Sequence, residues 1–568
     1  MTTPSGGEAE PVASPVASPD ASPDANPDAN PIETAVRAGY AFEGPALELG
    51  ALMLDAQTQS EAAVRIPLAM LNRHGLVAGA TGTGKTKTLQ LLAEQLSSAG
   101  VAVFAADVKG DLSGLAVPGE TNEKVTQRAA SVGQAWQAKG FPVEFYALGG
   151  AGTGVPLRVT MSAFGPTLLS KVLGLNETQE SSLGLVFHYA DRAGLPLLDL
   201  ADLRAVVQHL VSDEGKPELK ALGGLSSATA GVILRELIGF ADQGGDVFFG
   251  EPEFASSELL QVDTEGRGLI SLVELPELAE RPVVFSTFLM WLLADLFHDL
   301  PEVGDVDRPK LVFFFDEAHL LFDDASDAFL DQVAQTVRLI RSKGVGVFFV
   351  TQRPTDVPDD VLAQLGSRVQ HQLRAHTPND AKALKATVAT YPESGYGDLG
   401  AVLTGLGIGE AVVTVMDERG APTPVAWTRL RAPESRMGPM DADAMAAAVA
   451  ASPRQATYGA VVDRDSARER LAARLEEGAR KQAEEQDRAR AEEEAAEASK
   501  AEQEAEEKAR KEAERHVPVP KPSRRTSSRS SEKSGGLAGD VLGSKAFEDF
   551  MCTAAREIAR GVFRTGRR

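Results

Sequence analysis

A phosphate-binding loop is predicted at residues 79–86. The run Gly-Ala-Thr-Gly-Thr-Gly-Lys-Thr fits the pattern G-x-x-x-x-G-K-[ST] at every fixed position. In such loops backbone N–H groups and the following helix bind phosphate, while Lys85 reaches the terminal phosphates and Thr86 ligates Mg²⁺. A chance match is the alternative, but residues 76–78 have the pattern of a strand and 88–96 that of a helix. The expected nucleotide contacts are Gly79, Ala80, Thr81, Gly82, Thr83, Gly84, Lys85, Thr86 and Lys87.

Two carboxylates follow the apolar run at residues 311–315. Asp316 is predicted to hold Mg²⁺, and Glu317 to polarise the attacking water as general base. Acids also end buried strands as simple helix caps, here of a helix that begins at Ala318. The phosphate loop in the same chain favours the catalytic interpretation.

Two further polar residues are candidates at strand ends. Gln352 follows the run 345–351 and is a candidate γ-phosphate sensor; the alternative is a simple turn before Pro354. Arg374 ends the predicted strand 368–374. It could stabilise transition-state charge in its own site or in a neighbouring subunit, or form an ordinary ion pair.

The segment Asp107-Val-Lys-Gly-Asp111 ends another predicted strand, where loop capping and direct chemistry are equally compatible with the residues. The histidines do not have metal-ligand spacing, so we expect them in the core or on the surface and predict no zinc site. These are His188, His209, His319 and His371. The single Cys552 excludes an internal disulfide framework.

Apolar runs that alternate with helix-period stretches predict an α/β fold with a mainly parallel sheet. The predicted strands are 75–78, 101–106, 143–148, 269–274, 311–315, 345–351, 368–374 and 410–416. Parallel strands end at one edge of a sheet, which would gather the candidate residues there.

Changes in composition divide the chain into eight segments. These are a disordered Pro/Ala/Asp tail at 1–34, the first part of the core at 35–161, a helical insertion at 162–246, the second part of the core at 247–431, a connector at 432–463, a charged Ala/Glu-rich segment at 464–515, a basic flexible linker at 516–540 and a basic amphipathic helix at 541–568. Whether the charged segment is a solvated helix or disordered stays open. The last helix is a candidate site for a protein partner; contact with a membrane surface or DNA, or packing on its own core, are the alternatives.

The net charge of −24 argues against a protein whose whole surface coats nucleic acid or anionic membrane, although it allows a local basic channel. Apolar runs are too short to span a bilayer, and the amino terminus does not have the pattern of a signal peptide. We therefore expect a cytoplasmic protein without a transmembrane segment.

Several motifs together resemble the HerA-like ATPases, in particular a bacterial branch of HerA-like helicase proteins. The resemblance covers roughly residues 40–430 and is specific in combination. Besides the phosphate loop, it rests on Asn72-Arg-His-Gly75, Asp107-Val-Lys-Gly-Asp-Leu112, Leu173-Gly-Leu-Asn-Glu-Thr-Gln179, Asp316-Glu-Ala-His319, Thr351-Gln-Arg-Pro354 and Tyr391-Pro-Glu-Ser394.

This resemblance implies a RecA-like core of the HerA/FtsK superfamily, ATP and Mg²⁺ as cofactors, a homo-hexameric ring and double-stranded DNA as the partner that is moved. HerA carries an N-terminal β-barrel, but too few ordered residues precede Gly79 here for a full barrel. The alternative hypothesis is a nucleotide-dependent assembly scaffold or regulatory ATPase that acts on a protein.

Overall fold

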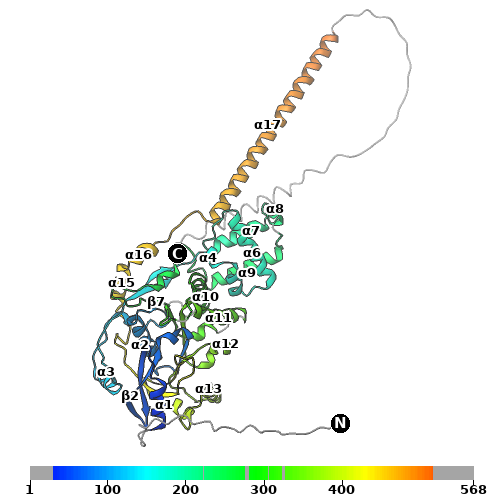
Figure 1. Ribbon diagram of the computed structural model, residues 1–568. Coiled ribbons are helices and arrows are strands. Elements are labelled where there is room, and N and C mark those ends of the chain that lie inside the picture. The colour runs from blue at the N-terminus through cyan, green and yellow to red at the C-terminus, as the bar shows by residue number, and fades with distance from the viewer. Residues whose placement is uncertain (1–29, 222, 276–280, 305, 323–326, 516–568) are drawn as a thin grey trace, which may run out of the picture. The chain divides into compact units, whose positions relative to one another are not determined.

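The computed structural model describes residues 30–221, 223–275, 281–304, 306–322 and 327–515 (Figure 1). The chain forms two compact units, Met1–Arg480 and Lys481–Arg568. In the described part of the first unit the strands form one twelve-stranded sheet, in the order β2-β1-β12-β11-β10-β3-β9-β8-β4-β7-β5-β6. They are β1 (Ala46–Leu54), β2 (Gln57–Pro67), β3 (Gly75–Ala78), β4 (Ala102–Asp107), β5 (Val143–Leu148), β6 (Val155–Leu157), β7 (Ile270–Glu274), β8 (Leu311–Phe315), β9 (Val345–Thr351), β10 (Ser367–Gln370), β11 (Glu410–Thr414) and β12 (Ala426–Leu430).

The predicted α/β fold with a mainly parallel sheet is confirmed. Neighbouring strands from β10 to β6 run parallel. The remaining strands, from β11 to β2, extend the sheet with antiparallel pairs. The prediction omitted β1, β2, β6 and β12, and it extended the strand at 368–374 too far, because β10 ends at Gln370.

Strand β8 shows why the centre of the sheet is buried on both faces. Phe313 and Phe315 belong to one hydrophobic cluster and Val312 and Phe314 to the other, because successive side chains of a strand point to opposite faces. The parallel sheet therefore requires helices on both sides.

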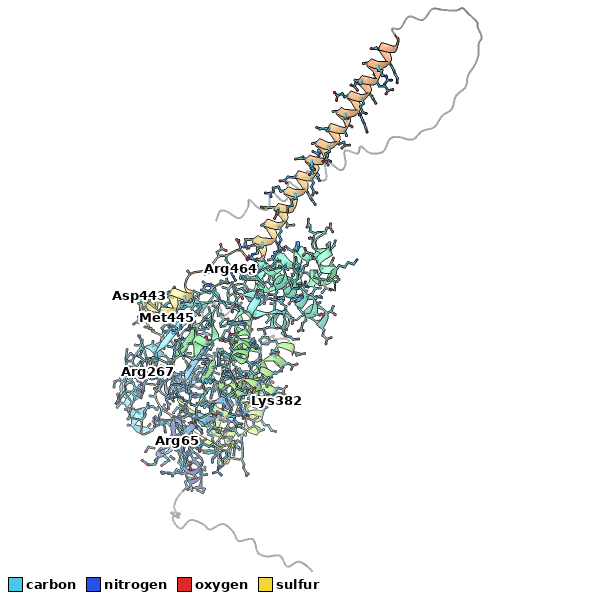
Figure 2. The ribbon with its side chains drawn as sticks, turned by 45° about the horizontal axis from the view of Figure 1, so that its top comes forward. Arg65, Arg267, Lys382, Asp443, Met445 and Arg464 are labelled. Atoms are coloured by element: carbon cyan, nitrogen blue, oxygen red, sulfur yellow. The ribbon has the colours of Figure 1, made fainter. Side chains whose placement is uncertain are left out.

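Helices cover the two faces. Side chains of α1 (Pro31–Gly39), α2 (Lys85–Ser98) and α15 (Ala442–Ala451) pack into one cluster, with Met445 of α15 buried in it (Figure 2). Side chains of α10 (Pro282–Asp299) and α11 (Asp327–Ile340) pack into the other. The other helices of the core and connector are α3 (Glu123–Ser131), α12 (Asp359–Leu362), α13 (Pro378–Ala389), α14 (Leu399–Gly405) and α16 (Pro453–Tyr458).

Helices also form the insertion. The apolar residues of α7 that recur at helical spacing are buried: Leu200, Leu203, Val206, Val207 and Leu210. Asn176 and Asp199 each begin a helix with a capping box, which satisfies N–H groups that the helix itself leaves unpaired. The insertion helices are α4 (Met161–Phe164), α5 (Pro166–Val172), α6 (Glu177–Arg192), α7 (Leu200–Val211), α8 (Lys216–Ala221) and α9 (Ser227–Asp242).

The ends of the chain differ in part from the prediction. Helix α1 begins at Pro31, capped by the Asn30 side chain, so the predicted tail boundary at residue 34 lies inside a helix. The charged segment is a helix, α17 (Ala467–Arg515), whose side chains are exposed from 472 to 512. The predicted linker and the predicted C-terminal amphipathic helix lie outside the described residues. In the described ranges no helix has the length and apolarity to span a membrane.

A strap, residues 431–441, connects β12 to α15 and packs on α2. The buried Glu94 carboxylate of α2 accepts the N–H groups of Glu434 (2.8 Å) and Ser435 (2.9 Å). Burial raises the pKa of Glu94 to about 7, although these hydrogen bonds oppose the shift. The predicted end of the core at residue 431 therefore falls before a segment that holds the helix of the phosphate loop.

Candidate nucleotide site

The candidate residues come from neighbouring parallel strands. The phosphate loop follows β3, Gln352 follows β9 and Asp316 follows β8, with β9 lying between β3 and β8. Strand β4, which ends at Asp107, pairs with the other side of β8. The structure thus brings these segments to one edge of the sheet, as the sequence predicted.

The phosphate loop has a conformation that requires its glycines. Gly82 (φ 83°) and Gly84 (φ 116°) lie in the left-handed region, and a Cβ atom on Gly79 would lie 2.5 Å from the Cβ of His371. The Thr83 hydroxyl donates to the Ala80 carbonyl at 2.7 Å. Because α2 starts directly after Gly84, its first N–H groups have no intrahelical acceptor, and the site fits a phosphate.

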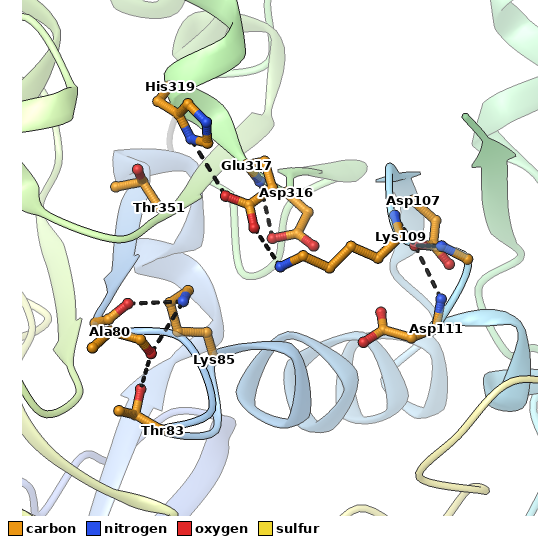
Figure 3. Close-up of polar contacts among 12 residues, drawn as sticks. Ala80, Thr83, Lys85, Asp107, Lys109, Asp111, Asp316, Glu317, His319 and Thr351 are labelled. Carbon is orange, nitrogen blue, oxygen red and sulfur yellow. Dashed lines mark hydrogen bonds and ion pairs between the residues drawn. The ribbon is translucent and has the colours of Figure 1, made fainter. Parts of the chain in front are cut away.

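Lys85 is buried at the start of α2. Its ammonium donates to the carbonyl oxygens of Gly79 (2.7 Å) and Ala80 (3.4 Å), so it lies inside the loop (Figure 3). Burial lowers the pKa of Lys85, although the nearby Glu317 opposes the shift. A cation with only carbonyl partners is suited to receive an anionic ligand.

Only one oxygen of the buried Asp316 carboxylate has a hydrogen-bond partner among the described residues. Its Oδ1 accepts the N–H of Glu317 at 2.9 Å, while Oδ2 has no hydrogen-bond partner among the described residues. Burial raises the pKa of Asp316 to about 7, although Lys109 opposes the shift. An unpartnered buried carboxylate oxygen fits the Mg²⁺ role predicted for Asp316, and carboxylate and hydroxyl oxygens are ligands that Mg²⁺ prefers.

Glu317 lies beside Asp316 with its backbone in the left-handed region (φ 48°, ψ 48°), which is unusual for a residue with a side chain. Its Oε1 forms an ion pair with the Lys109 ammonium (Figure 3). Its Oε2 is 3.3 Å from His319 Nδ1, but the two atoms do not form a hydrogen bond. The sequence did not indicate Lys109 as a partner of the candidate general base.

Asp107 caps the loop that carries Lys109. Its carboxylate accepts backbone N–H groups of Lys109 (3.2 Å), Gly110 (2.7 Å), Asp111 (3.3 Å) and Leu112 (2.7 Å). Of the two interpretations of this motif, loop capping thus describes the Asp107 side chain.

The other candidates differ in their exposure and in their contacts. Gln352 is exposed at the end of β9, and Thr86 is half-buried in the first turn of α2. Arg374 lies four residues beyond β10 and is exposed; its guanidinium donates to the Thr81 carbonyl at 3.2 Å. Lys87 donates to Gln90 Oε1 at 3.2 Å. Arg374 therefore contacts the phosphate loop, but from a loop and not from the end of a strand.

His371 is a further buried residue at the loop. Its Nε2 is 2.9 Å from the Thr88 hydroxyl of α2, and its backbone N–H donates to the Ala78 carbonyl at 2.7 Å. Burial lowers the pKa of His371 to about 4, and the nearby Lys85 lowers it further. The sequence predicted only a core or surface position for this histidine.

The low pKa of His371 predicts a pH-dependent stability. The ordinary histidine pKa is 6.5 and the folded value is about 4, so the unfolded chain binds more protons in between, and stability falls as pH falls through that window. From pH 7.5 to 5.5 we expect the wild type to lose about 1 kcal/mol more unfolding free energy than His371→Gln. Denaturant unfolding at both pH values measures this difference. Equal losses in the two proteins would contradict a neutral buried His371.

A cavity of about 210 Å³ adjoins the loop and the first turn of α2. Arg128 of α3 holds two of its walls together, because its guanidinium donates to the carbonyls of Ile408 (2.9 Å) and Gly409 (2.8 Å). The Gly409 N–H in turn donates to the Thr83 carbonyl at 3.0 Å. The lining combines apolar side chains with cations: Val125, Ile408, Pro433 and Met437 with Lys87, Lys124, Arg128 and Arg431.

The sequence matches the family model described as helicase HerA-like C-terminal over residues 53–568. No protein with a curated description matches it. Similar solved structures include the bacterial conjugative coupling protein TrwBdeltaN70 (15% identity, 72% of this chain and 95% of that chain covered, TM-score 0.47). VirB4 of Thermoanaerobacter pseudethanolicus is 15% identical (69% and 97% covered, TM-score 0.44). The plasmid coupling protein TrwB in complex with ADP and Mg²⁺ is 16% identical (70% and 99% covered, TM-score 0.46).

Proposed function

The chain belongs to the helicase HerA-like C-terminal family, and from this premise we propose that it is an ATP-hydrolysing ring motor that moves double-stranded DNA. The main support for the proposal is that the phosphate loop, Asp316 and Glu317 lie at the same edge of the sheet. Positioning and electrostatic stabilisation are the main tasks of a protein in phosphoryl transfer, and this edge supplies groups for both.

Each residue of the site has a separate role in this proposal. The loop glycines and the start of α2 bind the phosphates, and Lys85 balances their charge. Thr86 and Asp316 would hold Mg²⁺, which neutralises phosphate charge when it is bound with the nucleotide. Glu317 accepts a proton from the attacking water, and Gln352 acts as sensor of the terminal phosphate. Arg374 stabilises charge in its own site or in the site of a neighbouring subunit.

We place the nucleoside part of ATP in the cavity beside the phosphate loop. The cavity begins at Gly84 and Thr88, directly behind the groups that bind phosphate. Apolar side chains of the lining suit the flat faces of a base, while its cations suit a ligand that carries phosphates. Arg128 keeps the walls in place through its bonds to the carbonyls of Ile408 and Gly409.

A DNA-dependent assay tests the proposal. We expect random-sequence duplexes to raise the ATPase rate of a homo-hexamer, and duplex affinity to fall at least tenfold between 50 and 200 mM salt, because phosphate contacts release counterions. The rate and fluorescence anisotropy are measured at each salt concentration, and mass photometry reports the subunit number. Glu317→Gln serves as the control for contaminating ATPases.

The outcome separates the two candidate functions. A protein that hydrolyses ATP but binds no duplex at low salt, with or without an ATP analogue, would contradict the DNA motor. That result would favour the alternative function, a regulatory ATPase or assembly scaffold that acts on a protein partner.

A further inference from the structure

We propose that Lys109 is a positioning residue that pairs with Glu317 and restrains its action as general base. The proposal rests on the ATPase function above, because it assigns a partner to the general base of that site. In this proposal the ion pair keeps the basal rate of ATP hydrolysis low.

The first support is the pairing itself. Two lysines lie near the acids, but only Lys109 contacts Glu317, whereas the Lys85 ammonium donates to the carbonyls of Gly79 and Ala80. An ammonium on Oε1 occupies an oxygen that would otherwise accept a proton from water. The Lys109 pKa is raised: burial acts against the shift, but the hydrogen bond to Glu317 and the nearby Asp316 outweigh it.

The second support is the way in which Lys109 is presented. The fully buried Asp107 carboxylate binds the N–H groups of residues 109–112, so the backbone of this short loop is fixed. Pairing costs less backbone entropy for a lysine on a fixed loop than for one on a mobile segment. The Lys109 side chain is 41% exposed and that of Glu317 is 10% exposed, so the lysine can be reached from outside while the glutamate is covered.

The third support is that Glu317 has no other strong partner among the described residues. Its Oε2 is buried without a hydrogen bond, although His319 Nδ1 is 3.3 Å away. Loss of Lys109 would leave a largely buried carboxylate without its cation, which destabilises the empty site and frees the base.

The experiment compares Lys109→Gln, Lys109→Arg and Lys382→Gln. Lys382 is an exposed lysine of α13 (Figure 2) and provides the matched control. Without DNA we expect Lys109→Gln to raise kcat about threefold to tenfold, because Glu317 is no longer held by the ammonium. KM should stay within about twofold of the wild-type value. Lys109→Arg should stay closer to the wild type than Lys109→Gln does, because it keeps a cation that can pair with the carboxylate.

A stability cycle on the nucleotide-free protein provides a readout that does not involve turnover. Lys109→Gln should lower the melting temperature by about 2 °C in the wild-type background. In the Glu317→Gln background it should have little effect, because the two residues act as a pair.

Three results would overturn the proposal. A large fall of kcat in Lys109→Gln that does not occur in Lys109→Arg would mean that Lys109 acts directly on phosphate. Unchanged turnover, or additive melting shifts in the cycle, would mean that the ion pair restrains nothing. If the wild type itself has no ATPase activity, the proposed function fails, whereas the stability cycle still tests the pair.

Discussion

Replacing Glu317 with glutamine should leave ATP bound but lower kcat by about 10²–10⁴-fold. The glutamine keeps the size of the side chain but cannot accept a proton from water, and general base catalysis contributes a factor of this size. Because the phosphate loop and Lys85 do not depend on Glu317 for their contacts, nucleotide binding should persist. Single-turnover hydrolysis and calorimetric binding of ATP measure the two effects separately.

A glutamate outside the site provides the control for this variant. Glu493 is exposed on α17, and Glu493→Gln should retain the wild-type rate. If Glu317→Gln retained that rate in the same preparation series, the general base would have to be another residue, and the role assigned to Lys109 would lose its basis.

Lys85→Ala should weaken ATP binding by about 100-fold, which is the scale for loss of one partner from a buried, charged hydrogen-bonded pair. The ammonium already lies inside the loop on the carbonyls of Gly79 and Ala80, so a bound phosphate would meet it without a large rearrangement. Titration with a non-hydrolysable ATP analogue measures the dissociation constant, with Lys382→Ala as the control. Equal affinities of Lys85→Ala and the control would place the phosphates elsewhere.

Much of the fold was predictable because local patterns determine it. Strands β3, β5, β8 and β9 have the predicted limits, since each is an apolar run that a glycine or a polar residue ends. Strand β2 was missed because its first residues, 57–61, are polar and largely exposed at the edge of the sheet. An edge strand exposes more polar side chains than the apolar runs by which central strands are recognised.

The sequence predicted residues of the candidate site only where they lie together in one short motif. The phosphate loop and the acids after β8 are such motifs, and the structure brings both to one sheet edge. The pairing of Lys109 with Glu317 and of His371 with Thr88 joins segments far apart in the chain, which spacing cannot reveal. Arg374 was misplaced because the alternation of buried and more exposed residues continues through His371 and Leu373, although the strand ends at Gln370.

The strap has a consequence for how the protein is made. Glu94 lies in the helix of the phosphate loop, whereas the N–H groups that satisfy its carboxylate belong to Glu434 and Ser435, which leave the ribosome some 340 residues later. Until then the emerging chain exposes the face of α2 that the strap covers and leaves the Glu94 carboxylate without these partners. The nucleotide site can therefore mature only late in synthesis, and a fragment that stops at residue 431 would leave α2 incompletely packed.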